Sequence, residues 1–112
     1  MATVEECEDA LHRLATRLSD NGEAAPRQAR VRRTLSCTVR DLGVVFTGLL
    51  DDGKLTGIAR ASDPQAQVRL ELGSDDLLEL VDGSLRIGPA LATGRVKVGA
   101  GVRDLLLLRS LL

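Results

Sequence analysis

The spacing of the apolar residues changes near residue 31, and this change constrains the fold more than any other feature of the sequence. Before that point apolar residues recur every three or four positions, the period of an amphipathic helix. They are Val4, Cys7, Leu11, Leu14 and Leu18. The pattern predicts a helix from about Val4 to Ser19, with Thr3 and Glu6 as a T-x-x-E capping box at its start. Asn21-Gly22 is expected to end it.

From Val31 onward the apolar period is two, which predicts a β-strand with one apolar and one polar face. Residues 22–29, with Pro26 among them, form a polar linker between the helix and this strand. The apolar face carries Val31, Leu35, Cys37 and Val39, and the polar face carries Arg32, Thr34, Ser36, Thr38 and Arg40. Arg33 interrupts the apolar face near its beginning, where the strand is expected to emerge into solvent.

Three further strands are expected between residues 44 and 72. They cover Val44–Leu50, Lys54–Ala61 and Ala66–Leu72. Asp51-Asp52-Gly53 is expected to form a hairpin turn, because Asp and Gly tolerate the positive φ that such turns require. Ser62-Asp63-Pro64 turns the chain again. The third strand carries small residues at alternate positions, Gly57, Ala59 and Ala61, which would leave space above the sheet if they face the helices.

The remainder of the chain predicts a short helix, a strand and a final helix. Ser74 is expected to cap the short helix, with Asp75 and Asp76 in its first turn and Gly83 at its end. Residues 85–92 contain Gly88-Pro89 and are expected to be irregular. The fifth strand is expected over Arg95–Val98, and a leucine-rich helix over Val102–Leu112.

These elements predict one domain over residues 1–112, of the α+β class. A single five-stranded sheet, mixed or antiparallel, should have one polar and one apolar face. The helices should pack on the apolar face and form a second layer.

Composition excludes several classes of function. The net charge is −1, so no global field attracts nucleic acid or anionic lipid. Phe46 is the only aromatic residue, which argues against stacking on bases or sugars. No signal peptide and no membrane-spanning run is evident, so we expect no integral membrane association. Cys7 and Cys37 form no CxxC pair and are expected to be free thiols in a reducing cytoplasm.

A local basic run is the one candidate for an electrostatic patch. It comprises Arg27, Arg30, Arg32, Arg33 and Arg40. We interpret it as the solvated face of a strand, and we expect no nucleic-acid partner.

The sequence gives little support to catalysis. His12, the only histidine, lies beside the apolar stripe of the first helix, so no Ser-His-Asp or Cys-His arrangement is possible. The pairs Asp51/Asp52 and Asp75/Asp76 are explained by a turn and a helix start. Gly99-Ala100-Gly101 suggests a dinucleotide fingerprint, but Asp104 occupies the third glycine position. We therefore predict no catalytic residue, no metal site and no cofactor.

An ordered series of segments fills the second half of the chain. It consists of Ala66–Leu72, the D-L-x-x-L-x-x-G helix ending at Gly83, Pro89-Ala90, the G-x-x-x-x-G segment Gly94–Gly99, and the leucine-rich Val102–Leu112. This series resembles the sterol carrier protein type-2 family, and the leading helix and meander fall in the same order. The resemblance implies a five-stranded sheet covered by helices around an apolar tunnel for fatty acyl chains, sterols or similar lipids. Members of that family are carriers, or ligand-holding modules fused to enzymes. Ser110-Leu111-Leu112 is not a peroxisomal signal, so we expect that the targeting role of the eukaryotic members does not carry over. We expect a bacterial protein and a cytoplasmic location.

The leucines either enclose a cavity or pack against each other. We favour a cavity that holds a hydrophobic small molecule or lipid without catalysis, with the final helix as a lid hinged at Gly99 and Gly101. The expected wall is Phe46, Leu77, Leu80, Val81, Leu85, Ile87, Leu91, Val96, Val98, Leu105 and Leu108. The alternative is an interaction module whose C-terminal helix, with Leu107, Leu111 and Leu112, docks on an enzyme partner or forms a homodimer. A third option is an accessory protein that presents an apolar intermediate to a biosynthetic enzyme.

Overall fold

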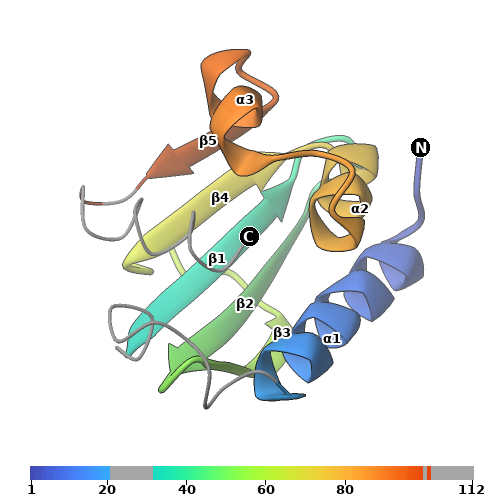
Figure 1. Cartoon of the computed structure of the whole chain (residues 1–112). Helices are drawn as coiled ribbons and strands as arrows, with labels where there is room; N and C mark the ends of the chain where they lie inside the picture. Colours follow the sequence, from blue (N-terminus) through green and yellow to red (C-terminus); the bar gives the residue numbers. More distant parts are fainter. Residues whose placement is uncertain (21–31, 100, 102–112) are drawn as a thin grey trace.

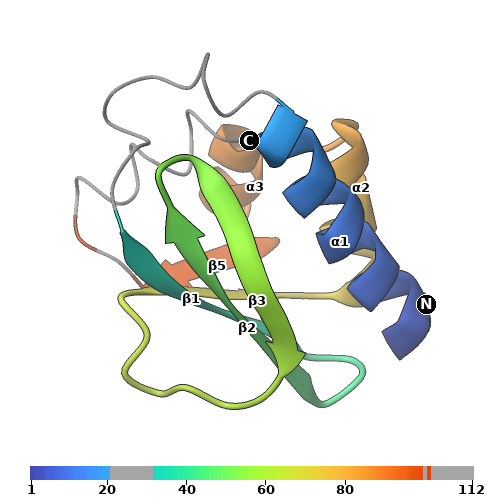
Figure 2. The same cartoon turned by 90° about the horizontal axis from the view of Figure 1, so that it is seen from below.

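The computed structural model describes residues 1–20, 32–99 and 101. It contains one five-stranded sheet of strand order β3-β2-β1-β4-β5, with the helices of the described residues on one face (Figures 1 and 2). β1 and β4 are parallel, and the other neighbouring strands are antiparallel. The elements are α1 (Val4–Asp20), β1 (Arg33–Val39), β2 (Val44–Asp51), β3 (Lys54–Arg60), β4 (Val68–Leu72), α2 (Ser74–Asp82), α3 (Ile87–Ala92) and β5 (Val96–Gly99). The predicted α+β class with a single mixed sheet is confirmed.

The first helix begins as its capping box predicts. The Glu6 amide donates to the Thr3 hydroxyl at 3.1 Å, and the Thr3 amide donates to the Glu6 carboxylate at 3.1 Å. These two bonds satisfy amides that the first helical turn cannot pair internally. The predicted stop at Asn21-Gly22 and the linker over 22–29, with Arg27 and Arg30, lie outside the described residues.

The β2–β3 hairpin closes at Asp52-Gly53, as predicted. Both residues have positive φ, 54° and 79°, so the turn has the type I′ geometry that suits the twist of a hairpin. At the beginning of β1, Arg33 is half-buried and lies opposite Leu50 in the register. Its guanidinium donates to the Arg32 carbonyl at 2.7 Å.

One expectation about the third strand is wrong. Gly57, Ala59 and Ala61 are exposed and do not leave space under the helices. The β2–β3 register shifts between Thr47 and Leu49, opposite Gly57, whose φ is +66°. A β-bulge of this kind changes which residues face the core. As a result, Leu55 and Ile58 are the half-buried side chains of this strand.

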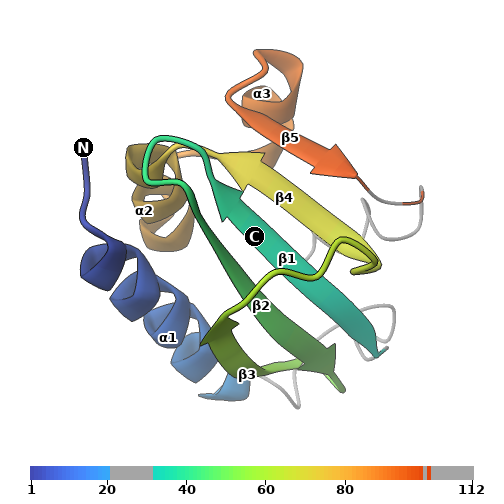
Figure 3. The ribbon, with the colours of Figure 1, turned by 180° about the vertical axis from the view of Figure 1, so that it is seen from behind.

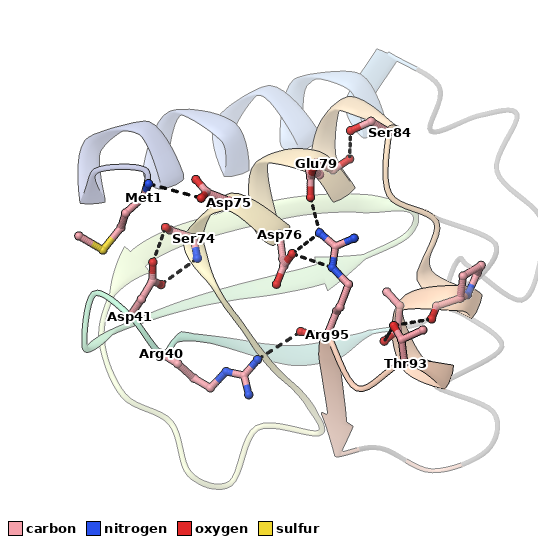
Figure 4. Close-up of polar contacts among 12 residues, drawn as sticks. Met1, Arg40, Asp41, Ser74, Asp75, Asp76, Glu79, Ser84, Thr93 and Arg95 are labelled. Carbon is pink, nitrogen blue, oxygen red and sulfur yellow. Dashed lines mark hydrogen bonds and ion pairs between the residues drawn. The ribbon is translucent and has the colours of Figure 1, made fainter.

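Ser74 does not cap the second helix, as the sequence had suggested. Gly73 is the N-cap residue, and Ser74 is the first residue of the helix, fully buried. Its amide donates to Asp41 Oδ1 at 2.8 Å and its hydroxyl donates to Asp41 Oδ2 at 2.6 Å (Figure 4). The β1–β2 turn therefore supplies the cap from a distant part of the sequence. These bonds hold the pKa of the Asp41 carboxyl below its ordinary value.

The same Ser74 hydroxyl accepts a hydrogen bond from the Ala2 amide at 3.0 Å, which joins the chain before α1 to the start of α2. At the other end of α2, Gly83 has φ 90° and donates to the Glu79 carbonyl, as predicted for a helix-ending glycine.

Residues 87–92 form helix α3, where the sequence had suggested irregular chain. Pro89 is the third residue of this helix, where a missing amide hydrogen costs nothing because first-turn amides lack intrahelical partners. Ile87 and Ala90 are buried, so packing stabilises the short helix. After it, the Arg95 guanidinium donates to Asp76 and Glu79 and ties the beginning of β5 to α2 (Figure 4).

The core lies between the helices and the sheet. Its most deeply buried side chains include Phe46, Val39, Leu72 and Val96. The other face of the sheet is not fully open to solvent, because the connection between β3 and β4 crosses it (Figures 2 and 3). Ser36, on the predicted polar face, is consequently only 6% exposed.

Candidate functional site

An apolar cavity of about 90 Å³ lies between α1, α2 and the sheet. Both helices and four of the strands contribute to its wall. The wall residues are Leu11, Leu14, Leu18, Leu35, Ser36, Cys37, Phe46, Thr47, Gly48, Leu50, Leu55, Ile58, Leu70, Leu77, Leu80 and Val81. The alternation along β1 and β2 directs the side chains of Ser36 and Thr47 to the opposite sheet face, so they border the cavity with backbone.

The helical part of the wall follows directly from helix periodicity. Leu11, Leu14 and Leu18 lie on one stripe of α1, and α2 adds three residues with the same spacing, Leu77, Leu80 and Val81. The two helices pack against each other, and the Arg17 guanidinium on α1 donates to the Val81 carbonyl on α2. This contact closes the helical side of the cavity.

On the sheet side, the register sets two cross-strand pairs into the cavity. Cys37 lies opposite Phe46, and Leu35 lies opposite Gly48. A side chain at Gly48 would approach its neighbours closely, since a Cβ there would lie 3.1 Å from Leu55 Cδ1. Gly48 therefore lines the cavity without a side chain and lets Leu55 pack over it, whereas the expected small residues of the third strand, Gly57, Ala59 and Ala61, do not line the cavity.

The cavity carries no charge among the described residues that line it. Among the described wall residues the one ionisable group is the Cys37 thiol, and burial raises its pKa to about 12. This thiol is therefore neutral at physiological pH and is a poor nucleophile. The described part of the wall fits an apolar ligand.

Burial differs between the two ends of the cavity. Leu11, Phe46, Leu77 and Leu80 are buried, whereas Leu14, Leu18, Leu35 and Leu55 are half-buried. The half-buried residues lie on the second half of α1, at the beginning of β1 and at the beginning of β3. This end is where the wall is thinnest among the described residues.

The structure brings together some of the residues that the sequence analysis placed in the wall. Phe46, Leu77, Leu80 and Val81 line the cavity. Ile87 and Val96 are buried in the same core, and Leu85, Leu91 and Val98 pack against it, but these five do not line the cavity. Leu105, Leu108 and the proposed lid helix lie outside the described residues.

Sequence reasoning missed most of the wall that comes from α1 and from strands β1 to β4. The missed residues are Leu11, Leu14, Leu18, Leu35, Cys37, Gly48, Leu50, Leu55, Ile58 and Leu70. The apolar stripe of α1 and the apolar face of β1 were the available signals. Both surfaces were predicted to be apolar, but nothing in the sequence indicated that α1 and β1 share a cavity with α2.

The other candidate residues are placed as follows. His12 is exposed on α1, and Asp76 is held by Arg95. Cys7 and Cys37 are buried free thiols. Among residues 1–20, 32–99 and 101 there is no group of three His, Cys, Asp or Glu side chains able to hold a metal ion. No helix within those ranges is long and apolar enough to cross a membrane.

Comparisons with known proteins agree with this architecture. A family model described as the SCP-2 sterol transfer family matches residues 11–100. The stereoselective inverting sec-alkylsulfatase Pisa1 from Pseudomonas sp. is 27% identical, with a TM-score of 0.69 over 88% of this chain and 15% of that chain. No curated protein matches the sequence.

Two Aedes aegypti structures match nearly end to end. Sterol Carrier Protein 2 Like 2 is 17% identical, with a TM-score of 0.70 over 98% of this chain and 100% of that chain. Sterol Carrier Protein-2 in complex with palmitate is 20% identical, with a TM-score of 0.61 over 97% of this chain and 94% of that chain. At these identities the likeness is one of fold. In contrast, this chain spans only 15% of the length of the alkylsulfatase.

Proposed function

The chain belongs to the SCP-2 sterol transfer family, as its sequence had suggested, and we propose that it binds a lipid in the cavity beneath α1 and α2 without catalysing a reaction on it. The observation that carries this proposal is the apolar wall. Among the described residues, the side chains that point into the cavity are aliphatic, apart from the Phe46 ring and the neutral Cys37 thiol. We further propose that residues 1–112 form one domain, and that this domain works in the cytoplasm and needs no cofactor.

The wall chemistry defines which part of a ligand enters. Each methylene moved from water into the cavity contributes about 0.8 kcal/mol. A hydroxyl or carboxylate would lose its hydrogen bonds to water and find no replacement there, which costs on the order of 1–3 kcal/mol or more. The ligand therefore enters by an aliphatic chain and keeps its polar group outside. The palmitate bound to the Aedes aegypti protein is a ligand of this kind.

The size of the cavity sets a second condition. Pockets for drug-sized ligands usually measure roughly 300–1,000 Å³, whereas this cavity measures about 90 Å³. It accommodates the end of an aliphatic chain, and a longer chain requires the wall to move outward. We expect the thin end, with Leu14, Leu18 and Leu55, to move at the lowest cost, because its side chains are only half-buried.

Native mass spectrometry of freshly purified protein tests the proposal, with a denatured aliquot as reference. We expect an extra mass on the native protein that disappears on denaturation and is identified as a lipid. Protein stripped of lipid and titrated with palmitate should form a 1:1 complex. Failure to bind palmitate, a sterol or any lipid extracted from the host would contradict the proposal.

The match to an alkylsulfatase favours a second candidate function, in which the domain holds an alkyl chain for a neighbouring catalytic unit. We expect a secondary alkyl sulfate to displace palmitate from the cavity, more strongly as its chain lengthens. Absence of displacement at saturating concentration would count against this role and leave the carrier role standing. The interaction-module alternative depends on Leu107, Leu111 and Leu112, which lie outside the described residues, and the comparisons give it no support.

A further inference from the structure

The sheet face turned away from the helices carries a second concave site. A groove of about 380 Å³ lies under the β3–β4 connection, which crosses this face (Figure 3). The groove is larger than the apolar cavity and falls in the size range of small-molecule sites. Its lining residues are Ser36, Thr38, Val45, Ser62, Asp63, Pro64, Arg69, Leu70, Glu71, Lys97, Val98 and Gly99.

Strand register arranges the polar groups of the groove in two rows. Ser36 on β1 pairs with Arg69 on β4, which pairs with Gly99 on β5. Two residues further along, Thr38 pairs with Glu71, which pairs with Lys97. Paired residues of neighbouring strands point to the same face at a spacing of about 5 Å. The six positions thus form a compact floor.

The Ser36 hydroxyl makes no hydrogen bond to another described residue. The residue as a whole is only 6% exposed, but no buried side-chain oxygen or nitrogen among the described residues lacks a partner, so the exposed part of Ser36 includes its hydroxyl. By alternation the hydroxyl points away from the apolar cavity and into the groove. Whatever fills the groove therefore meets a hydroxyl that is ready to donate or accept.

Two cations lie on the same floor as Ser36, Arg69 on β4 and Lys97 on β5. A Cβ built on Gly99 would lie 3.0 Å from both Nε and Nη2 of Arg69, so the guanidinium lies across Gly99. Lys97 lies two residues earlier on the same face of β5. Neither cation forms an ion pair with a described residue, and within the described ranges the Arg69 side chain makes one hydrogen bond, to the Ala66 carbonyl at 3.4 Å. Their donors remain available to a ligand.

The carboxylates of the groove limit what charge it accepts. Glu71 lies directly opposite Lys97 and two residues after Arg69 on β4, and Asp63 on the β3–β4 connection accepts a hydrogen bond from the Gln65 amide at 3.1 Å. The site therefore offers cations and hydrogen-bond acceptors side by side. A bare anion satisfies only the cations, whereas an anion with adjoining hydroxyl groups satisfies both.

We propose that this groove binds a small hydroxylated organic anion, a carboxylate or phosphate, with its charge between Arg69 and Lys97 and its hydroxyl groups on Ser36, Thr38 and Glu71. This site is separate from the lipid cavity and has the opposite chemistry, so it stands whether or not the cavity binds lipid.

Amide NMR titration of the ¹⁵N-labelled chain tests the proposal, with glycerol 3-phosphate and inorganic phosphate as probes and sodium chloride at equal ionic strength as reference. We expect saturable shifts of Ser36, Arg69 and Gly99 with both phosphates, with tighter binding of glycerol 3-phosphate. Arg69→Gln and Lys97→Gln should each weaken binding at least tenfold, while Arg13→Gln, exposed on α1, should leave it unchanged. Glu71→Gln should tighten the binding of inorganic phosphate by roughly fivefold, because a like charge is removed.

Several results would overturn the proposal. They are shifts that follow ionic strength without saturating, equal binding by wild type and Arg69→Gln, and weaker phosphate binding by Glu71→Gln. Tighter binding of inorganic phosphate than of glycerol 3-phosphate would show that the hydroxyl groups of the ligand do not contribute, and would contradict the proposed contacts with Ser36, Thr38 and Glu71. Shifts produced by phosphatidylglycerol vesicles but by neither phosphate would assign the face to a membrane surface instead. Thermal unfolding of each variant establishes that it is folded before its binding is compared.

Discussion

Gly48→Ala is expected to make the protein at least as stable and a weaker binder of lipid. Gly48 lies in the interior of β2 with ordinary strand geometry, and it faces the cavity opposite Leu35. Alanine in a strand interior is favoured over glycine by roughly 0.5–1 kcal/mol, because the unfolded chain loses less backbone freedom. The closest contact of the new methyl group is the Leu55 Cδ1 atom at 3.1 Å, the end of a flexible side chain that can shift, while the Thr56 carbonyl oxygen at 3.5 Å and Ile58 Cγ1 at 3.9 Å are at ordinary contact distance.

The same methyl group occupies space that a ligand would use. In a cavity of about 90 Å³ it excludes one or two methylene groups of an aliphatic chain. At about 0.8 kcal/mol for each methylene, affinity should fall by about 4- to 15-fold. Stability and affinity are therefore expected to change in opposite directions, a result that partial unfolding does not produce.

The assay combines thermal unfolding of lipid-free protein with a titration of palmitate into wild type and Gly48→Ala. Gly88→Ala is the matched control, because Gly88 lies in α3 outside the cavity wall and a Cβ there meets nothing within 4 Å. We expect the control to gain up to about 1 kcal/mol as a helix substitution and to bind palmitate as the wild type does. If Gly48→Ala binds palmitate as tightly as wild type, the cavity beside β2 is not the lipid site.

Three further variants and one control variant test the cavity and its surroundings. Asp41→Asn removes the carboxylate that accepts the Ser74 hydrogen bonds, so it should lower the midpoint of urea unfolding at neutral pH. Folding lowers the pKa of Asp41, so the carboxylate stabilises the protein fully above pH 3.8, the ordinary pKa. This stabilisation should vanish as the pH falls through the lower pKa of the folded state. Burial raises the pKa of Cys37 from 9.0 to about 12, so the neutral thiol favours the folded state fully below pH 9, and this stability is lost as the pH rises toward 12. In urea unfolding compared at pH 8 and about pH 10.5, the wild type should therefore lose more stability than Cys37→Val. Leu80→Ala should cost about 2–5 kcal/mol and recover more stability with palmitate than wild type does, because its cavity is larger. Leu72→Ala, equally buried but outside the wall, should show a similar loss and only the wild-type recovery, and equal recovery in both variants would contradict the assignment of Leu80 to the wall.

Local sequence signals predicted most of the elements and their turns. The alternation from Leu35 to Val39 and the Asp52-Gly53 turn depend on interactions between near neighbours, and both are present in the structure. Helix α3 was missed because Gly88-Pro89 disfavours a helix interior, whereas Pro89 lies in a first turn and Ile87 is held by core packing.

The candidate site was less predictable, since it depends on which faces meet. A single bulge at Gly57 reverses the alternation of β3, and no local pattern marks that residue as a bulge. The role of Gly48 follows only from its pairing with Leu35 and its closeness to Leu55. The cap on α2 comes from Asp41, 33 residues before Ser74. Each feature requires the tertiary arrangement, which one sequence does not contain.

Strand β1 lies between the two sites and contributes to both. Leu35 and Cys37 face the apolar cavity, and Ser36 and Thr38 face the polar groove. Because strand side chains alternate, a one-residue slip of β1 would place hydroxyl groups in the cavity and leucine in the groove. Two hydrogen bonds oppose such a slip at the start of the strand: the Thr34 amide donates to the Gln67 side chain at 3.1 Å, and the Gln67 amide donates to the Thr34 hydroxyl at 3.0 Å. This reciprocal pair fixes β1 against the segment that enters β4, and the contrast between the two faces depends on that register.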